Sequence, residues 1–311
     1  MSERLVYVNG QIAPESQSFI SVRDKGFVYG DAVFDTARTF GGKLFRAAEH
    51  VDRLYDSLAY ARIDPGMTKA EMLAATEDLV ERNLPMLRPD EDYWVTQRVT
   101  AGTQTMDGDP PANAGATVVI ECTPIPLRAR ASFFRDGAPA AIPARRRVPP
   151  EALSPNVKSN NYLNMMIAQR EVEATSPGAW ALMLDRNGDI AEGPGCNYFV
   201  VKDGVVHTPT RDFVLAGVSR QVAIDLCAKL GIECREETVQ VQRAMTGEEA
   251  FFTSTSLCAC PISTINGRAY PAGAPGPVTK RIMDAFAEEV GFDYVGQYLK
   301  FLGTGPAATG I

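Results

Sequence analysis

A stretch rich in proline, alanine and arginine divides this chain of 311 residues into two unequal parts. It begins at Thr123 and reads TPIPLRARASFFRDGAPAAIPARRRVPPEALSP. Proline interrupts helices and strands, so the stretch predicts a connection followed by the entry into a second domain. We expect a first domain over residues 1–122, an interdomain loop over 123–135 and a second domain over 136–311. Either domain is long enough to bury a hydrophobic core.

The first part mixes strand and helix patterns. Residues 4–12 alternate in polarity and carry Asn9-Gly10, which is typical of a hairpin turn. The segment HVDRLYDSLAYARI has leucines at helical spacing. A second helix is predicted over 68–86, because Thr68 and Glu71 form a capping-box pattern. With two further strands, DYWVTQRVTAG and ATVVIECTPIP, the part is predicted to be a small α/β domain.

The second part also combines strands with marked helices. Asn187-Gly188 and Asp203-Gly204 are turn signals between segments that alternate in polarity. GVSRQVAIDLCAKLG has one apolar stripe and a terminal glycine, and GPVTKRIMDAFAEEVGF has Pro277 near a helix start and Gly291 near the helix end. The fold class predicted for the whole chain is therefore α/β (α+β) in two domains.

Composition and charge exclude several classes of protein. Hydrophobic residues make up 45% and charged residues 22%, with a net charge of −7, which disfavours a general nucleic-acid binder. No apolar run approaches the roughly 18 residues that span a bilayer, and MSERLVYVNGQ lacks a signal pattern. Six cysteines without a CxxC motif and two histidines predict reduced thiols, no metal site and a cytoplasmic protein. The arginines at 145–147 are interpreted as a solvated loop.

One lysine has an unusual setting. Lys158 lies in LSPNVKSNNYLNMM, among serines, asparagines and a proline, directly before a helical pattern. A lysine amine is nucleophilic only when neutral, and burial or nearby positive charge favours that form. Its characteristic partner is a carbonyl carbon, with which it forms a Schiff base. The alternative interpretation is an ordinary solvated loop lysine.

Other stretches supply what an aldehyde cofactor such as pyridoxal phosphate (PLP) needs beside a lysine. A phosphate is bound by helix N-terminal amides and hydroxyls, which LAGVSRQ and the cluster Thr253 to Ser256 provide. Arg53 adds a positive charge. Glu192, before Gly193-Pro194-Gly195, provides an acid for the ring nitrogen, and Tyr162 provides a hydrogen-bond donor. Each stretch alone also fits an ordinary helix start, turn or surface salt bridge.

Taken in order, these stretches resemble the fold-type IV PLP enzymes, the class-IV aminotransferase family. This family includes branched-chain, D-amino acid and (R)-amine transaminases and aminodeoxychorismate lyases. The pieces that carry the resemblance are EHVDRLYDS, KSNNYLN, DIAEGPGCNYF, LAGVSR and GPVTKRI. The resemblance covers nearly the whole chain. It implies a small α/β domain, a larger PLP-binding domain of sheet and helices, and a homodimer.

The resemblance also implies roles for individual residues. Lys158 is similar to the Schiff-base lysine, which also shuttles the proton, and Glu192 to the partner of the pyridine nitrogen. Tyr162 is similar to the donor to the phenolic oxygen, and Leu215 to the apolar contact on one ring face. The residues that correspond to the phosphate site are Arg53, Gly217, Val218, Ser219 and Ser256. The positions that correspond to the substrate side are Tyr29, Phe34, Arg38, Arg98, Leu257 and Cys258.

The substrate is less sharply indicated. Tyr29 and Phe34 would form an apolar wall, and Arg98 in QRVTAG lies where the D-amino acid enzymes hold the substrate carboxylate. This chain lacks the glycine and the histidine that follow in those enzymes, and TSLCAC departs from the branched-chain enzymes. Arg38 and Arg98 fit buried salt bridges equally well. We expect a transaminase that moves an amino group between an apolar amino acid or amine and a 2-keto acid. The donor would be a branched-chain L-amino acid, a D-amino acid or an (R)-amine.

Three alternatives are distinct from that expectation. Within the fold, a lyase of the aminodeoxychorismate type would release pyruvate without consuming an acceptor. A cysteine hydrolase would use Cys258 or Cys260 with His207, although no cysteine begins a helix and nothing orients the base. A protein that keeps the fold only for binding would not need both Lys158 and Glu192.

Overall fold

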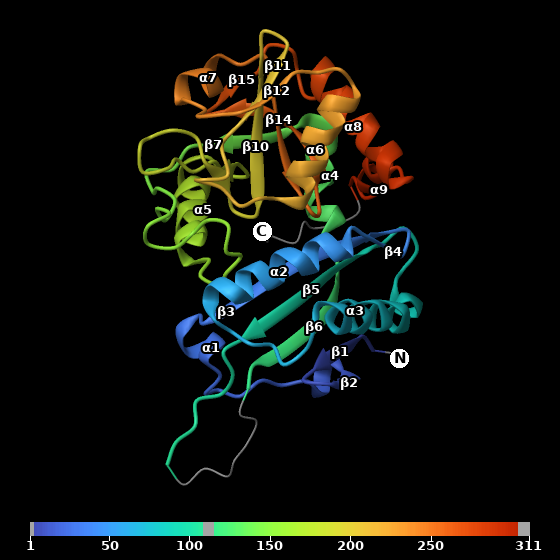
Figure 1. Cartoon of the computed structure of the whole chain (residues 1–311). Helices are drawn as coiled ribbons and strands as arrows, with labels where there is room; N and C mark the ends of the chain where they lie inside the picture. The colour runs from blue at the N-terminus through green and yellow to red at the C-terminus, as the bar shows by residue number, and fades with distance from the viewer. Residues whose placement is uncertain (1–2, 108–114, 304–311) are drawn as a thin grey trace. The chain divides into compact units, whose positions relative to one another are not determined.

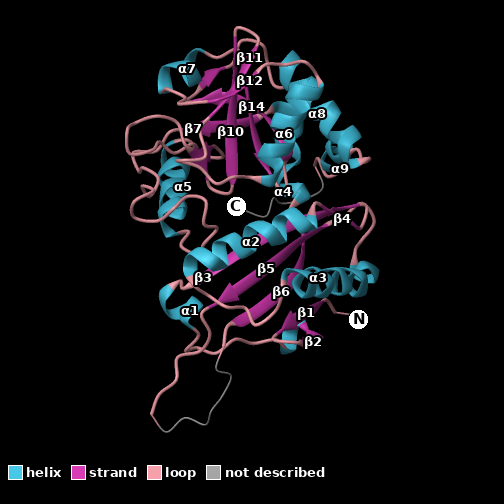
Figure 2. Ribbon diagram, viewed as in Figure 1, coloured by secondary structure: helices cyan, strands magenta, loops and turns pink. Residues whose placement is uncertain are grey.

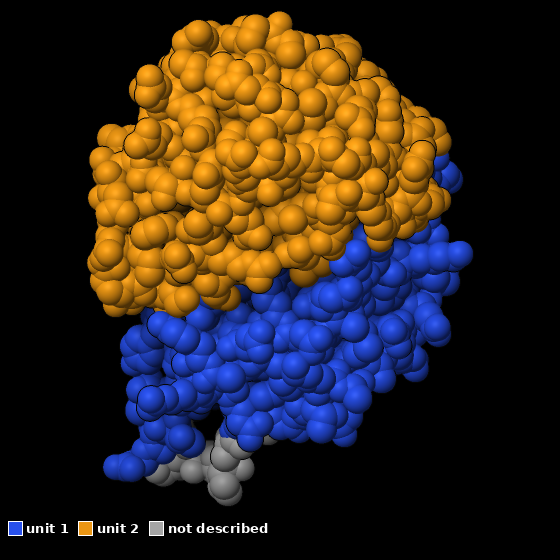
Figure 3. Space-filling model, turned by 45° about the horizontal axis from the view of Figure 1, so that its top comes forward, with its two compact units in different colours: residues 1–125, 157–161 blue, residues 126–156, 162–311 orange. Residues whose placement is uncertain are grey.

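A computed structural model of the chain describes residues 3–107 and 115–303. The chain forms two compact units, shown in blue and orange in Figure 3. The first comprises residues 1–125 and 157–161, and the second comprises 126–156 and 162–311. Both units contain helices and strands, as Figure 2 shows, so the predicted α/β class with two domains is confirmed.

The first unit is built on one antiparallel sheet of six strands, in the order β2-β1-β6-β5-β3-β4 (Figure 1). The β1–β2 hairpin turns at Asn9 and Gly10, both of which have positive φ, as the Asn-Gly signal predicts. The strands are β1 (Leu5–Val8), β2 (Gln11–Pro14), β3 (Ala32–Phe40), β4 (Lys43–Phe45), β5 (Tyr93–Thr100) and β6 (Thr117–Pro124).

Two long helices complete the core of the first unit. These are α2 (Ala47–Ala61) and α3 (Lys69–Asn83), while the shorter α1 (Lys25–Tyr29) precedes β3. Leu54 and Leu79 are fully buried and pack with residues of β5 and β6. The predicted capping box forms, because Thr68 and Glu71 exchange hydrogen bonds. Short 3-10 turns cover Glu15–Gln17 and Leu84–Met86, so α3 ends three residues earlier than predicted.

The second unit is built on a mixed sheet of nine strands. The path is β12-β11-β10-β13-β14-β7-β8, with β15 on β14 and β9 on β10. Its central strands are almost wholly buried, which explains their continuous apolar runs. The strands are β7 (Ala138–Ala141), β8 (Trp180–Ala181), β9 (Glu192–Gly193), β10 (Cys196–Lys202), β11 (Val205–Thr208), β12 (Cys234–Glu236), β13 (Glu249–Ser254), β14 (Cys258–Ile265) and β15 (Arg268–Ala269).

Helices of the second unit pack on this sheet. α8 ends at Gly291 in the left-handed region, as the sequence predicts, and its first turn donates two backbone N–H groups to Glu249. The helices are α4 (Leu127–Asp136), α5 (Leu163–Thr175), α6 (Val218–Lys229), α7 (Val241–Thr246), α8 (Pro277–Val290) and α9 (Tyr294–Leu299). None of the helices in the described parts of the chain has the length and apolar character to cross a membrane.

The structure corrects the loop expected over residues 123–135. Most of it is helix α4, which buries Leu127, Ala131 and Phe134 on one face. These positions follow helical spacing, but the surrounding arginines and prolines obscured the pattern. Phe134 stacks on Tyr298 of α9 at 4.3 Å between ring centroids, so the helix is held by a partner distant in sequence.

Candidate functional site

Lys158 belongs to the first unit and pairs with the first residues of β3, which β4 leaves unpaired on that side. Its carbonyl accepts the backbone N–H of Phe34 at 2.9 Å, and the backbone of Asn160 donates to Ala32 at 2.9 Å. Val157 packs in the core of this unit. Because its flanking backbone is fixed at two points, Lys158 is carried by a strand edge rather than by a mobile loop. The lysine is therefore not a freely solvated loop residue.

The side chain of Lys158 lies against Phe34. Its Nζ is 4.4 Å from the centroid of the Phe34 ring, which is a cation–π distance. Arg98 on β5 also approaches this ring, with its Cζ 5.0 Å from the centroid. Arg98 donates to Asn160 Oδ1 at 2.7 Å and lies 3.6 Å from Glu121. The ring of Phe34, itself a candidate from the sequence, thus lies beside two further candidates, Lys158 and Arg98.

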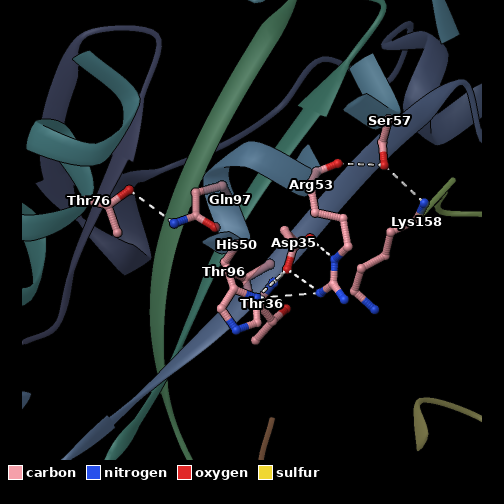
Figure 4. A network of polar contacts seen from close by, with 9 residues as sticks. All are labelled: Asp35, Thr36, His50, Arg53, Ser57, Thr76, Thr96, Gln97 and Lys158. Atoms are coloured by element: carbon pink, nitrogen blue, oxygen red, sulfur yellow. Dashed lines mark hydrogen bonds and ion pairs between the residues drawn. The ribbon is translucent and has the colours of Figure 1, made fainter. Parts of the chain in front are cut away.

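Arg53 lies in a buried polar network on α2 (Figure 4). Its Nε donates to Asp35 Oδ2 at 2.7 Å and its Nη2 to Asp35 Oδ1 at 2.8 Å. His50 Nδ1 lies 2.7 Å from Asp35 Oδ1. Burial alone would raise the pKa of Asp35, but the charge of Arg53 and the hydrogen bond with His50 hold that pKa well below its ordinary value.

A single hydroxyl connects Arg53 with Lys158. Ser57 Oγ donates to the carbonyl of Arg53 at 3.0 Å and accepts the backbone N–H of Lys158 at 3.2 Å, as Figure 4 shows. Ser57 is completely buried. Burial lowers the pKa of His50, against the opposing effect of Asp35, and the positive charges of Arg53 and Lys158 lower it further. Because the Asp35 carboxylate can only accept, the proton between the two groups lies on His50 Nδ1.

Two other predicted residues of the first unit have different settings. Arg38 is 1% exposed, donates to the carbonyl of Thr39 at 3.0 Å and pairs with buried Asp92 at 3.8 Å. The salt-bridge alternative therefore holds for Arg38, and its predicted substrate-binding role is not supported. Tyr29 ends α1 and is 63% exposed.

In the second unit, Glu192 is 3% exposed and bound at both carboxylate oxygens. Oε1 accepts from Arg147 Nε at 3.0 Å, while Oε2 accepts from the N–H of Leu215 at 3.0 Å and from Asn197 Nδ2 at 3.3 Å. The sharp turn predicted after it forms, with φ +75° at Gly195. Three donors from separate segments therefore fix this carboxylate in one orientation.

Arg147 corrects the interpretation of the 145–147 arginines as a solvated loop. Its side chain is 13% exposed and lies against Glu192. Arg146 donates to the carbonyl of Asp185 at 2.8 Å, whereas Arg145 forms a more exposed ion pair with Glu171. Burial of Arg147 depends on a carboxylate 45 residues away, so the local sequence did not indicate it.

The predicted phosphate residues of the second unit occupy two places. Gly217 caps α6, and Val218 and Ser219 open it, so their N–H groups have no acceptor within the helix. A Cβ on Gly217 would lie 2.2 Å from Asn197 Oδ1, which explains why a glycine is needed here. Ser256 is buried and its hydroxyl accepts a hydrogen bond from Arg130 of α4. Asn197, whose Oδ1 lies beside Gly217, also donates through Nδ2 to Glu192, so it links the α6 cap with this carboxylate.

The remaining candidates are packed or half-buried. Leu257 and Cys258 are fully buried at the start of β14, and Cys258 has φ +58°. Tyr162 precedes α5 as its N-terminal cap and is half-buried, as is Leu215. The roles predicted for these four residues therefore stay predictions.

Comparison with known proteins places this geometry in a family. The Amino-transferase class IV family matches residues 32–265. A putative branched-chain-amino-acid aminotransferase of Methanocaldococcus jannaschii is 35% identical over 286 residues, covering 91% of this chain and 95% of its own. The chain belongs to the class-IV aminotransferases. D-alanine aminotransferase of Bacillus licheniformis is 30% identical, over 92% of this chain and 96% of its own.

Solved structures agree with this assignment. The branched-chain amino acid aminotransferase of Escherichia coli superposes with a TM-score of 0.84 at 28% identity, covering 92% of this chain and 94% of that chain. This class-IV aminotransferase is therefore a PLP-dependent enzyme, as the resemblance implied. The named relatives are aminotransferases, so the lyase alternative is not favoured.

The donor set of this class-IV aminotransferase fits PLP. The first unit provides an amine and a guanidinium on two residues whose backbones one buried hydroxyl connects. The second provides a fixed buried carboxylate and the open N-terminus of a twelve-residue helix. These are the groups that an aldehyde, a phosphate and a pyridine nitrogen require.

The structure argues against the cysteine hydrolase. Cys258 and Cys260 are buried on β14, and burial raises the pKa of the Cys260 thiol. His207 lies on β11, which β10 and β13 separate from β14, so about 14 Å divides the strands. His207 Nδ1 is instead paired with Glu237 at 2.7 Å. No nucleophile–base pair forms between these residues.

Sequence reasoning missed several residues that hold the candidates in place. They act through contacts between distant segments, although His50, Ser57 and Asn197 lie within motifs that carry the family resemblance. The missed residues are Asp35, His50, Ser57, Arg130, Arg147 and Asn197.

Proposed function

We propose that Lys158 binds PLP covalently and transfers the proton in the reaction. The observation that carries this proposal is its setting: its backbone is fixed at the edge of β3 and its Nζ lies against Phe34. Lys158 Nζ would be the group that takes the proton from the substrate α-carbon and later gives it back. When bound, PLP supplies an electron-withdrawing ring that stabilises negative charge at that carbon.

We propose supporting roles for the other residues. Glu192 keeps a proton on the pyridine nitrogen, since its carboxylate is fixed and buried. Tyr162 donates to the phenolic oxygen and Leu215 packs on one ring face. The residues proposed to bind the phosphate are Arg53, Gly217, Val218, Ser219 and Ser256.

We propose an α-amino acid with an apolar side chain as the amino donor, and a 2-keto acid as the acceptor. The support is that Arg98 Cζ and Lys158 Nζ lie 5.0 and 4.4 Å from the centroid of the same Phe34 ring, so a carboxylate binder and the proposed reactive amine share one aromatic neighbour. A guanidinium suits a carboxylate because it offers parallel donors. Phe34 itself offers apolar surface to the side chain.

Borohydride trapping tests the central proposal. Reduction fixes the bond between PLP and its lysine, and peptide mass mapping then identifies the modified residue. We expect the label on Lys158, together with loss of the visible absorbance band and of turnover in Lys158→Ala. Lys69→Ala is a control, since Lys69 is half-exposed and pairs with Asp52. A label on any other lysine would refute the assignment.

A donor panel tests the substrate class. L-leucine, D-alanine and (R)-1-phenylethylamine are each offered with pyruvate or 2-oxoglutarate as acceptor. We expect one of the two amino acids to exceed the amine in kcat/KM, and the preferred enantiomer to identify the stereochemistry. A preference for the amine would contradict the proposed carboxylate contact.

We propose that the protein is a homodimer in a reducing compartment such as the cytoplasm. Large apolar residues are clustered between positions 19 and 29 and are 44–80% exposed: Phe19, Ile20, Val22, Phe27, Val28 and Tyr29. Such patches mark interaction surfaces, and a second copy would cover this one. All six cysteines are free thiols, which supports the compartment. Light scattering of Phe19→Ser/Val22→Ser tests the dimer, and an unchanged mass would overturn this interface.

A further inference from the structure

Asp35 engages one side of the Arg53 guanidinium through two parallel hydrogen bonds. The Nε···Oδ2 and Nη2···Oδ1 distances are 2.7 and 2.8 Å, the fork geometry in which both partners are fixed in one plane. Asp35 points from β3 and Arg53 from α2, so the contact joins a strand to the helix packed on it (Figure 4). The orientation of this guanidinium is therefore set by the sheet, not by the rotamer preferences of an isolated arginine.

Burial distinguishes the inner residues of this network from the outer one. Asp35 is 0% exposed and His50 is 2% exposed, whereas the side chain of Arg53 is 12% exposed. The carboxylate is thus the inner member of the network and the guanidinium is the outer one. His50 also binds Asp35, with its Nδ1 at 2.7 Å from Oδ1, the oxygen that Arg53 Nη2 contacts as well.

Stability alone is a weak reason for such a network. Removing a carboxylate and a guanidinium from water costs several kcal/mol per ion, and apolar residues of equal volume often serve as well or better. A buried, hydrogen-bonded pair is instead effective at holding a charged group in one place. An arginine that binds phosphate gains from this arrangement, because less rotamer entropy is lost when the ligand arrives.

We propose that Asp35 is a positioning residue that presents the Arg53 guanidinium to the phosphate group of the cofactor. This inference rests on the phosphate-binding role proposed for Arg53. Asp35 does not touch the cofactor in this proposal. It acts through Arg53, and His50 holds Asp35.

The affinities of the apoprotein for PLP and for pyridoxal test this directly. Pyridoxal has the same ring and aldehyde but no phosphate, so the dissociation constant of pyridoxal divided by that of PLP isolates the phosphate contacts. We expect Asp35→Asn to weaken PLP binding about tenfold or more while pyridoxal binding stays within about twofold. Arg53→Ala should lower the ratio further, and adding Asp35→Asn to Arg53→Ala should change nothing more.

Asp92→Asn is the matched control. Asp92 is also 0% exposed in the first unit and accepts hydrogen bonds from Thr39 Oγ1, Gly41 and Gly42. The Asp92→Asn variant therefore measures the effect of losing a buried carboxylate that does not contact Arg53. We expect it to lower the melting temperature and leave the pyridoxal-to-PLP ratio of dissociation constants unchanged. Should Asp35→Asn not fold, Asp35→Glu keeps the charge but displaces it by one methylene group, and the ratio should still fall.

The outcomes separate this inference from the proposed function. If Arg53→Ala lowers the ratio but neither Asp35 variant does, the positioning role is overturned and the phosphate role of Arg53 stands. If Arg53→Ala leaves the ratio unchanged, both are overturned. A reduced ratio in Asp92→Asn as large as in Asp35→Asn would also overturn the inference, because the effect would then be one of general destabilisation.

Discussion

Arg147 Nε lies 3.0 Å from Glu192 Oε1, and both side chains are largely buried. With Leu215 and Asn197 on the second oxygen, the carboxylate has donors at both ends. Such a carboxylate is held still, which is what a partner for a ring nitrogen requires. Arg147 is therefore part of the support of Glu192, although the local sequence around it is typical of a surface loop.

Replacing the Glu192 charge should slow the reaction more than it disturbs the fold. Glu192→Gln keeps the shape but loses the negative charge, so we expect kcat to fall by about 10²–10⁴-fold at saturating PLP. Glu249→Gln is the control, because Glu249 is equally buried but caps α8. That variant should lower the melting temperature and retain kcat. An unchanged kcat in Glu192→Gln would contradict the ring-nitrogen role.

Arg98 should distinguish amino acids from plain amines. Arg98→Gln removes the proposed carboxylate contact, so the KM for an amino acid should rise about tenfold or more while that for an amine changes little. Glu121→Gln provides the complementary measurement, since Glu121 lies 3.6 Å from Arg98 Nη2. Loss of this competing carboxylate should lower the KM for amino acids. Equal effects of Arg98→Gln on both donor types would refute the assignment.

The six thiols should differ in their reactivity toward alkylating reagents. Burial raises the pKa of Cys122 to about 12, and it raises the pKa of Cys196 and Cys260 as well. A hydrogen bond from Cys227, assisted by the charge of Arg220, lowers the pKa of Cys234, which is also partly exposed. Iodoacetamide should therefore modify Cys234 first in the folded protein. Mass mapping checks this, and Cys234→Ser should remove the fast phase.

The stability contribution of Asp35 should depend on pH with a definite sign. Its native pKa lies below the ordinary value of 3.8, so the native state binds the proton more weakly than the unfolded chain. The contribution is complete well above pH 3.8 and decreases as the pH falls below it toward the native pKa. Urea unfolding should show a difference between wild type and Asp35→Asn that narrows in acid. A constant difference across that range would contradict the depressed pKa.

The local structures were predictable because the residues that specify each turn, helix cap or helix end are close to one another in the sequence. The β1–β2 turn at Asn9-Gly10, the capping box of α3 and the glycine that ends α8 all form as expected. The main error in predicting local structure was α4. There the prolines and arginines suggested a loop, although the apolar residues follow helical spacing. The stretch that carries Lys158 was expected in the second domain, but its backbone pairs with β3 of the first unit.

We could predict from the sequence the two-part α/β organisation, the family and the residue types that PLP chemistry requires. These follow from periodicity, turn signals and ordered motifs, each of which is local. The folded chain was needed to show that Arg38 and Arg147 are buried in ion pairs, and that Asp35, His50 and Ser57 surround Arg53 and Lys158. Burial and pairing of a charge depend on which segments of the chain pack together, and no local pattern specifies that.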